Sequence, residues 1–414
     1  MTSTTDRSAA LRAEVRAWLA EHWTGTDDAP WRRAVLQAGW AVPTWDSSTF
    51  GRGLTRAEAE VVGEEFTAAD APGAAIDLRS FRQQPWLNLL GDPIRGYGGK
   101  QIRDEELPRL LTEEWTVGCL LYSEPGAGSD LAGLQTRAEL DGDHYIVNGQ
   151  KIWTTNGHEA QFALLIARTD WDVEKHAGLS FFVIDMDSPG IEVRPIVQIT
   201  GDREFNEVFL TDVRVPATRM IGEPGQGWKV IQIALAAERA GMGGGASARS
   251  DAAPTGFAGT ASDLVEAARC AGRDGDPLVR QDIARILSWR LANSWTTDRA
   301  RLRARHGSFD LANVGKLAMS RILHGAADLK YRLQGRQSLV YDYEHPPDHP
   351  VDRDLMFAFI NSIGGGSDQI QRNIISERVL GLPKGFQPDK GIPFRAVRQG
   401  GSTAETTQNG RTTR

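Results

Sequence analysis

Two nearby stretches carry most of what this chain is expected to do: Leu120–Asp130, which reads LLYSEPGAGSD, and Gln150–Gly157, which reads QKIWTTNG. In the first, Pro125 fixes its own φ, and the small residues that follow let backbone N–H groups approach a ligand closely. The second places the indole of Trp153 and two hydroxyls at the end of an expected strand. A flat, redox-active ring needs an apolar face and a few directed hydrogen bonds from its protein. The two stretches therefore predict a site for such a ring.

The composition is that of an ordinary soluble globular protein. The 414 residues are 40% hydrophobic and 24% charged, which allows two or three compact units or one large one. A net charge of −7 argues against nucleic-acid binding, which requires a clustered basic surface. Cys119 and Cys270 cannot build a disulfide framework and do not have the spacing of a metal site. We find neither a signal peptide nor an apolar run long enough to span a bilayer, so we expect a cytoplasmic protein that does not enter membranes.

The chain changes character twice along its length. Residues 1–116 have helical periodicity, whereas residues 117–222 contain short strand-like runs separated by hairpin turn signals. Residues 223–398 return to helices, several of them longer than twenty residues, as is typical of a bundle. The polar residues 399–414 are expected to form a disordered tail. The predicted fold class is α+β, with an N-terminal helical domain, a central mostly antiparallel β domain and a C-terminal helical bundle.

Several helices are indicated by specific signals. Leu11, Val15 and Leu19 recur on one apolar helical face, and Thr55 followed by Glu58 is the pattern of a capping box. A loop is expected at Ala246–Gly259, which is rich in glycine, alanine and serine. The helices expected after the β domain are Lys229–Arg239, Ala261–Arg269, Leu278–Arg305, Leu311–Leu333 and Asp354–Leu380.

A third stretch, Ile363–Arg372, reads IGGGSDQIQR and is followed by ERVLGLP at Glu377–Pro383. The three stretches, in this order and at this spacing, closely resemble the acyl-CoA dehydrogenase family. The order of helices, β domain and helices is also that of the family, so the resemblance covers almost the whole chain. It implies FAD as the cofactor, an acyl-CoA as the substrate and an electron-transferring flavoprotein as the electron acceptor, in a homo- or hetero-oligomer.

The resemblance also assigns site residues. Trp153 is expected to cover one face of the flavin ring, and Thr155 to donate a hydrogen bond near its reactive nitrogen. Ser129 and Arg239 are expected to contact the substrate. The complete set of expected cofactor contacts is Leu120, Tyr122, Ser123, Gly128, Ser129, Trp153, Thr155, Ser367 and Gln369.

Two signatures of the family are missing from this chain. The glycine-rich motif that usually binds the flavin diphosphate from a neighbouring subunit has only a poor substitute at Leu333–Gln337. The arginine-phenylalanine-glycine signature of an earlier helix has only Arg269 and Arg273 as approximate stand-ins. FAD remains the expected cofactor, but the binding of its adenine end and the subunit arrangement stay open.

The position of the usual catalytic base is occupied by a glycine. Removing the Cα proton of a thioester requires a carboxylate beside Cα. In many family members this glutamate directly precedes the glycine that aligns with Gly366, and here that position is Gly365. The Gly365 backbone N–H can still polarise the thioester carbonyl as an oxyanion-type donor.

Other branches of the family carry the base directly before an arginine on the first helix after the β domain, where this chain has Glu238 and Arg239. Helical spacing places Glu238 on a stripe with Ile231 and Leu235, and an apolar site raises the pKa of a carboxylate toward the working pH. Pairing with Arg239 does not explain Glu238, because adjacent helical residues do not face each other. We therefore expect Glu238 to be the base, with Glu266 as the weaker candidate.

The predicted function is α,β-dehydrogenation of an acyl-CoA to the trans-2-enoyl-CoA. One alternative is a flavin-dependent monooxygenase or another oxidative enzyme on the same fold, although such an enzyme has no need of Glu238. The other is a catalytically silent subunit of a hetero-oligomeric acyl-CoA dehydrogenase, in which a partner chain supplies the base. The identity of the acyl group is not indicated by the sequence.

Overall fold

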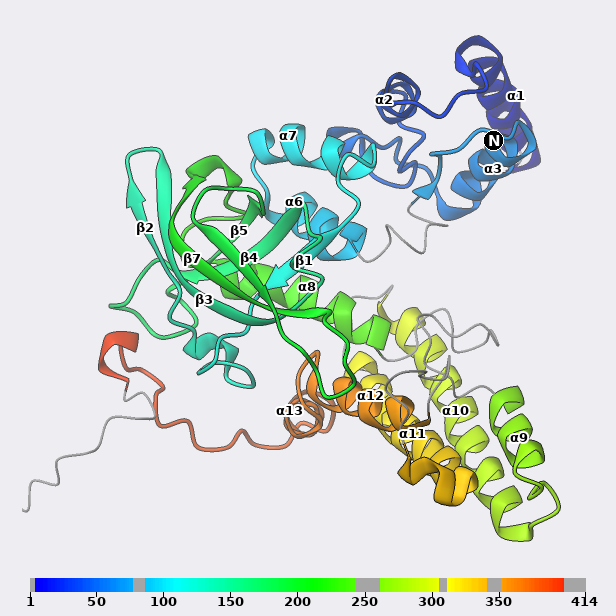
Figure 1. Ribbon diagram of the computed structural model, residues 1–414. Coiled ribbons are helices and arrows are strands. Elements are labelled where there is room, and N and C mark those ends of the chain that lie inside the picture. Colours follow the sequence, from blue (N-terminus) through cyan, green and yellow to red (C-terminus); the bar gives the residue numbers. More distant parts are fainter. Residues whose placement is uncertain (1–3, 77–85, 243–260, 305–310, 341–350, 398–414) are drawn as a thin grey trace, which may run out of the picture.

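The computed structural model describes residues 4–76, 86–242, 261–304, 311–340 and 351–397. It has N-terminal helices, a central curled sheet and C-terminal helices (Figure 1), so the predicted fold class is confirmed. In the part of the chain that the structure describes, no helix is both long and apolar enough to cross a membrane.

The N-terminal helices form where the sequence signals place them. Leu11, Val15 and Leu19 are buried as one face of the first helix, and both hydrogen bonds of the Thr55–Glu58 capping box are present. These helices and turns are α1 (Thr4–His22), α2 (Ala29–Gln37), α3 (Arg56–Ala68), η2 (Leu87–Gly91), α6 (Asp92–Tyr97) and α7 (Lys100–Leu111).

The central sheet is mostly antiparallel, as expected, and has the order β1-β4-β2-β3-β7-β6, with β5 pairing β4. The exceptions are the parallel pairs β1–β4 and β2–β4. The strands are β1 (Gly118–Leu121), β2 (Arg137–Asp141), β3 (His144–Thr155), β4 (Phe162–Arg168), β5 (Leu179–Asp185), β6 (Ile191–Pro195) and β7 (Phe205–Pro216).

Strand β4 is buried on both faces and joins two apolar cores. Phe162, Leu164 and Ile166 pack in the core shared with the N-terminal helices, whereas Ala163 and Leu165 pack inside the curled sheet. Because successive side chains of a strand point to opposite faces, a continuous apolar run can serve two cores. This strand therefore fixes the sheet against the N-terminal helices.

Helix α8 (Gly227–Met242) connects the three parts of the molecule, because it contacts β4, β5, α6 and the long helix α11. The other helices after the sheet are α9 (Ala261–Cys270), α10 (Pro277–Ala304), α11 (Leu311–Gln334), α12 (Val351–Ile363) and α13 (Asp368–Ile374).

The prediction of a single helix over Asp354–Leu380 is wrong. The chain leaves the helix after Ile363, because Gly365 and Gly366 take left-handed φ values of 60° and 87°. It starts again at α13 and ends in a short π-helical turn, η8 (Ile375–Val379). The expected loop at Ala246–Gly259 and the expected disordered tail lie outside the described residues.

After α13 the chain returns to the β domain as an extended strap, drawn in orange to red in Figure 1. Phe394 donates its backbone N–H to Val173 O at 2.8 Å, and Arg395 pairs with Asp172 at 2.7 Å. Lys175 pairs with both Asp130 and Asp389, and so joins the strap to the end of the first sequence stretch.

Candidate active site

The structure brings the first two sequence stretches together. The backbone N–H of Ile152 donates to Ser123 O at 3.0 Å, and the Lys151 ammonium donates to Tyr122 O at 3.0 Å. The loop that follows β1 therefore lies directly against β3, beside Trp153.

A buried ion pair holds this loop in place. The Lys151 side chain is fully buried, and its Nζ also donates to Glu124 Oε1 and Ile166 O, both at 2.9 Å. The three donors of the ammonium thus have three acceptors. Glu124 in turn accepts the backbone N–H groups of Gln135 at 2.7 Å and Thr136 at 2.8 Å. Glu124 therefore joins the start of the loop to its end at Gln135 and Thr136, and Lys151 anchors it to β3.

The environment of the pair shifts both of its pKa values. Burial alone raises the pKa of Glu124, but the Lys151 charge and the N–H donors outweigh it and lower that pKa overall. Burial lowers the pKa of Lys151. The sequence reasoning did not single out either residue as functional, although both stand within the quoted stretches.

Arg168 supports the far end of the same loop. Its guanidinium donates to Ala132 O at 2.7 Å and to Leu134 O at 3.2 Å, and its Cζ lies 3.4 Å from the centroid of the Phe394 ring. Burial lowers the pKa of Arg168 to about 10. An arginine that ends a fully apolar strand was a signal that sequence reasoning did not use.

Trp153 sits on an irregularity of β3. The register with β7 shifts between Lys151 and Thr154, and Trp153 takes a left-handed φ of 63°. Trp153 remains 58% exposed, and its ring makes an edge contact with Phe205. Thr155 is exposed as well, whereas Thr154 between them is buried. The bulge therefore turns the indole and the Thr155 hydroxyl outward together.

The glycine-rich loop beside Trp153 presents an open backbone. Gly128 and Ser129 are exposed, and a Cβ added at Gly128 would meet no atom within 4 Å. By contrast, Tyr122 is buried and Leu120 packs against the core. The exposed indole of Trp153 and the open backbone of Gly128 and Ser129 leave room for the face of a flat cofactor.

The remaining cofactor residues predicted from the sequence form a second group on α13. Ser367 caps this helix by accepting the Ile370 N–H at 3.4 Å, and Gln369 is exposed. The helix contacts α11. The described contacts do not join Ser367 or Gln369 to the loop around Ser129.

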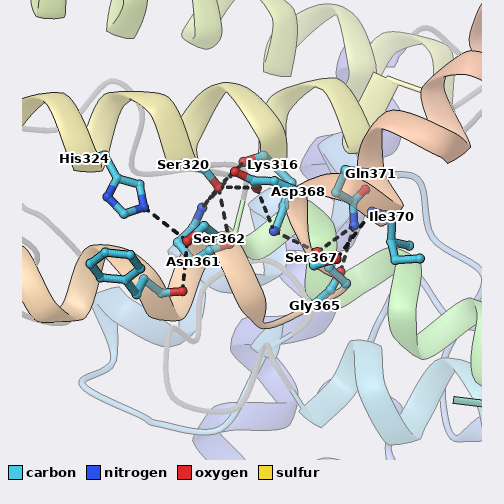
Figure 2. A network of polar contacts seen from close by, with 12 residues as sticks. Lys316, Ser320, His324, Asn361, Ser362, Gly365, Ser367, Asp368, Ile370 and Gln371 are labelled. Atoms are coloured by element: carbon cyan, nitrogen blue, oxygen red, sulfur yellow. Dashed lines mark hydrogen bonds and ion pairs between the residues drawn. The ribbon is translucent and has the colours of Figure 1, made fainter. Parts of the chain in front are cut away.

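Gly365, which stands where many relatives carry the base, lies in the turn between α12 and α13. The Gln371 side chain donates to Gly365 O at 2.9 Å and to Gly366 O at 3.2 Å (Figure 2). Among the hydrogen bonds of the described residues, none uses the Gly365 N–H. That donor is therefore available to a ligand.

Of the two candidates for the base, the structure describes the side chain of Glu266 but not that of Glu238. Helix α8 continues through Glu238 and Arg239, but their side chains lie outside the described residues. Glu266 has a 63% exposed side chain and pairs with Arg269 at 3.6 Å. Arg273 pairs with Asp276. Both arginine stand-ins are thus engaged locally at the surface.

Comparison with known proteins identifies the family that this fold and site define. The acyl-CoA dehydrogenase middle domain matches residues 119–213, and the acyl-CoA dehydrogenase C-terminal domain matches residues 225–380. The chain belongs to the acyl-CoA dehydrogenase family, and it is an acyl-CoA dehydrogenase.

Individual relatives agree with this assignment. The chain is 37% identical over 410 residues to acyl-CoA dehydrogenase IpdE1 of Mycobacterium tuberculosis, covering 90% of this chain and 97% of that one. It is 31% identical over 302 residues to cyclohexane-1-carbonyl-CoA dehydrogenase of Syntrophus aciditrophicus, covering 69% and 73% of the two chains. The structure of the ChsE4–ChsE5 complex of Mycobacterium tuberculosis superposes with a TM-score of 0.60 at 25% identity, covering 93% and 100%.

Proposed function

We propose that this enzyme catalyses the FAD-dependent α,β-dehydrogenation of an acyl-CoA thioester to the trans-2-enoyl-CoA. The observation that carries the proposal is an exposed indole, Trp153, next to the residue that binds the loop with the open positions Gly128 and Ser129, in a chain of this family. FAD, when bound, would accept the hydride that leaves Cβ and deliver the electrons to an electron-transferring flavoprotein. In the proposal, FAD is held on one side by the predicted contacts of the β domain and on the other side by Ser367 and Gln369.

Glu238 is the proposed base for the Cα proton. Helix α8 buries Ile231 and Ala234, and it contacts both the sheet and α11, the helix on which α13 packs. Helical spacing places position 238 on the same face as positions 231 and 234. An apolar helical face raises the pKa of a carboxylate and so makes it a better base near neutral pH.

The Gly365 N–H is the proposed donor to the thioester carbonyl. A hydrogen bond to that oxygen stabilises the enolate-like charge that develops as the Cα proton leaves. Arg239 and Ser129 are proposed to contact the substrate. Because one relative is named for an alicyclic acyl-CoA, cyclohexane-1-carbonyl-CoA belongs in the substrate screen together with linear and branched acyl-CoAs.

A second candidate is a non-catalytic subunit in a mixed oligomer. It is favoured by Gly365 at the usual position of the base, and by the similarity to a chain of the ChsE4–ChsE5 complex. The two candidates differ in what the pure chain does. An acyl-CoA will reduce the flavin bound to a catalytic subunit under anaerobic conditions, but it will not reduce flavin bound to a silent subunit.

Replacing Glu238 tests the proposed mechanism. Glu238→Gln keeps the size and polarity of the side chain but removes the basic carboxylate. We expect bound flavin and substrate-induced spectral changes to persist, while flavin reduction slows by about 10²–10⁴-fold, the usual effect of losing a general base. The measurement is anaerobic stopped-flow spectroscopy with the best acyl-CoA from the screen.

The matched control is Glu266→Gln, on the exposed face of α9. Because Glu266 already pairs with Arg269 at the surface, we expect its variant to reduce flavin at the wild-type rate. A slow Glu266 variant together with a fast Glu238 variant would reverse the assignment of the base.

A further inference from the structure

We propose that the ion pair between the buried Lys316 and the part-buried Asp368 is a positioning device for the Gly365 turn, and through it for the thioester carbonyl of the substrate. The proposal rests on the role of the Gly365 N–H under the proposed function. Lys316 and Asp368 do not touch the reacting atoms in this scheme. They act by holding the backbone that does.

The pair lies directly beside the turn (Figure 2). Lys316 projects from α11 with no solvent exposure, and its Nζ donates to Gly366 O at 2.8 Å and lies 3.4 Å from Asp368 Oδ1. Ser320, one helical turn further along α11, donates to the same Asp368 oxygen at 2.8 Å. The carboxylate at the start of α13 is thereby tied to α11 by two side chains.

Two buried amides extend the network, Asn361 of α12 and Gln371 of α13. Asn361 Nδ2 donates to Ser320 Oγ at 3.0 Å, and Ser320 Oγ lies 3.3 Å from Asn361 O. Gln371 is fully buried and donates to both Gly365 O and Gly366 O. The network therefore joins the helix before the turn, the turn itself and the helix after it.

These contacts fix the peptide planes on either side of the proposed donor. Gly364 donates its N–H to Ile360 O at 2.7 Å, which fixes the plane before it, and Gln371 holds the Gly365 carbonyl, which fixes the plane after it. The Gly365 N–H belongs to the single peptide plane between these two. Three consecutive glycines would otherwise have wide backbone freedom, so side-chain anchors are needed to keep this plane in one orientation.

Burying a lysine is costly, and a pair that served packing alone could be replaced by apolar residues at little cost. This pair does more than fill space between helices, because the Lys316 ammonium donates a hydrogen bond to the carbonyl of Gly366 in the turn. Removing either partner should therefore loosen the turn more than the helices around it.

The first test is hydrogen exchange, measured by mass spectrometry on the flavin-loaded enzyme. In Lys316→Met and in Asp368→Asn we expect the peptide spanning residues 361–372 to exchange at least about 10-fold faster, as the loss of one or two net hydrogen bonds implies. The matched control is Lys330→Met, which removes the 3.0 Å pair between Lys330 of the same helix α11 and Asp354 of α12. The control should leave exchange at residues 361–372 unchanged.

The second test asks whether the turn positions the carbonyl. Its probes are the acyl-CoA that the wild-type enzyme turns over fastest and the matching S-alkyl thioether, which lacks the carbonyl. We expect both variants to lose about 10-fold in affinity for the thioester, equivalent to one hydrogen bond, and to keep their affinity for the thioether. If Lys316→Met does not fold, Ser320→Ala removes the 2.8 Å hydrogen bond that holds the Asp368 carboxylate, and the same two effects are expected.

The outcomes distinguish the positioning role of the ion pair from the proposed role of the Gly365 N–H. Unchanged exchange in the variants, or faster exchange with an unchanged preference for the thioester, would overturn the positioning role. If the wild-type enzyme itself binds thioester and thioether equally, the role of Gly365 in the proposed function fails, whatever the exchange rates are. Loss of the thioester preference together with faster exchange supports both.

Discussion

At the scale of single residues, the most consequential feature is a charge pair inside the loop that the cofactor is expected to contact. Glu124 and Lys151 are nearly inaccessible to water and satisfy each other together with backbone groups. Breaking such a pair from one side leaves a buried charge without compensation. We expect Lys151→Met to lower the free energy of unfolding by about 3–5 kcal/mol, measured by denaturant titration.

A surface pair provides the comparison. Arg56 and Glu60 lie 3.2 Å apart on α3, with side chains 67% and 57% exposed. Arg56→Met should change stability by less than about 1 kcal/mol, because exposed pairs contribute little. Equal effects of the two variants would show that Lys151 is not a structural anchor of the loop.

At the scale of the element, β3 carries a bulge that turns Trp153 outward. A left-handed φ is unfavourable for any residue with a Cβ and free of that penalty for glycine. We therefore expect Trp153→Gly to be more stable than Trp153→Ala by about 1 kcal/mol, which reverses the usual order in a strand. Thermal unfolding of the two variants measures the difference. Both should bind flavin more weakly than the wild type.

Gln150, on the same strand before the bulge, is the control position. Its φ is not left-handed, so Gln150→Ala should be more stable than Gln150→Gly. If alanine is also the more stable residue at position 153, the bulge geometry is wrong, and with it the outward direction of the indole.

At the scale of the whole molecule, the C-terminal helices expose an apolar stripe that suggests an assembly. Leu291, Trp295 and Leu302 share one face of α10, with side chains 51%, 62% and 58% exposed. We expect the purified chain to form an oligomer, with itself or with a second chain, that buries this stripe. Trp295→Glu should then shift the mass measured by light scattering to a smaller species while circular dichroism stays unchanged.

Leu140→Glu is the control, because Leu140 is equally exposed at 62% but lies on β2 of the sheet. It should leave the mass of the assembly unchanged. A wild-type chain that is monomeric and binds FAD stoichiometrically would refute both the assembly and the need for a partner at the flavin diphosphate.

Local signals in the sequence were sufficient for many of the elements and for selecting the two stretches that the structure brings together. The capping box at Thr55, the apolar face of α1 and the two quoted stretches each depend on residues close in sequence, so they could be predicted without a tertiary structure. The resemblance to the family then indicated the fold class and the enzyme class, which are confirmed. The roles of Glu238 and Gly365 stay predictions.

The tertiary structure decided what supports the site. Lys151 and Arg168 reach carbonyls far away in the sequence, and Lys316 meets Asp368 only because α12 turns the chain back along α11. The break of the last predicted helix at Gly365 depends on the same contacts, because glycine only permits a left-handed turn. The buried donors of Lys316 and Gln371, which bind the carbonyls of Gly366 and Gly365, stabilise the left-handed turn over a continued helix. Such partners depend on how separate elements pack, and no local pattern of residues carries that information.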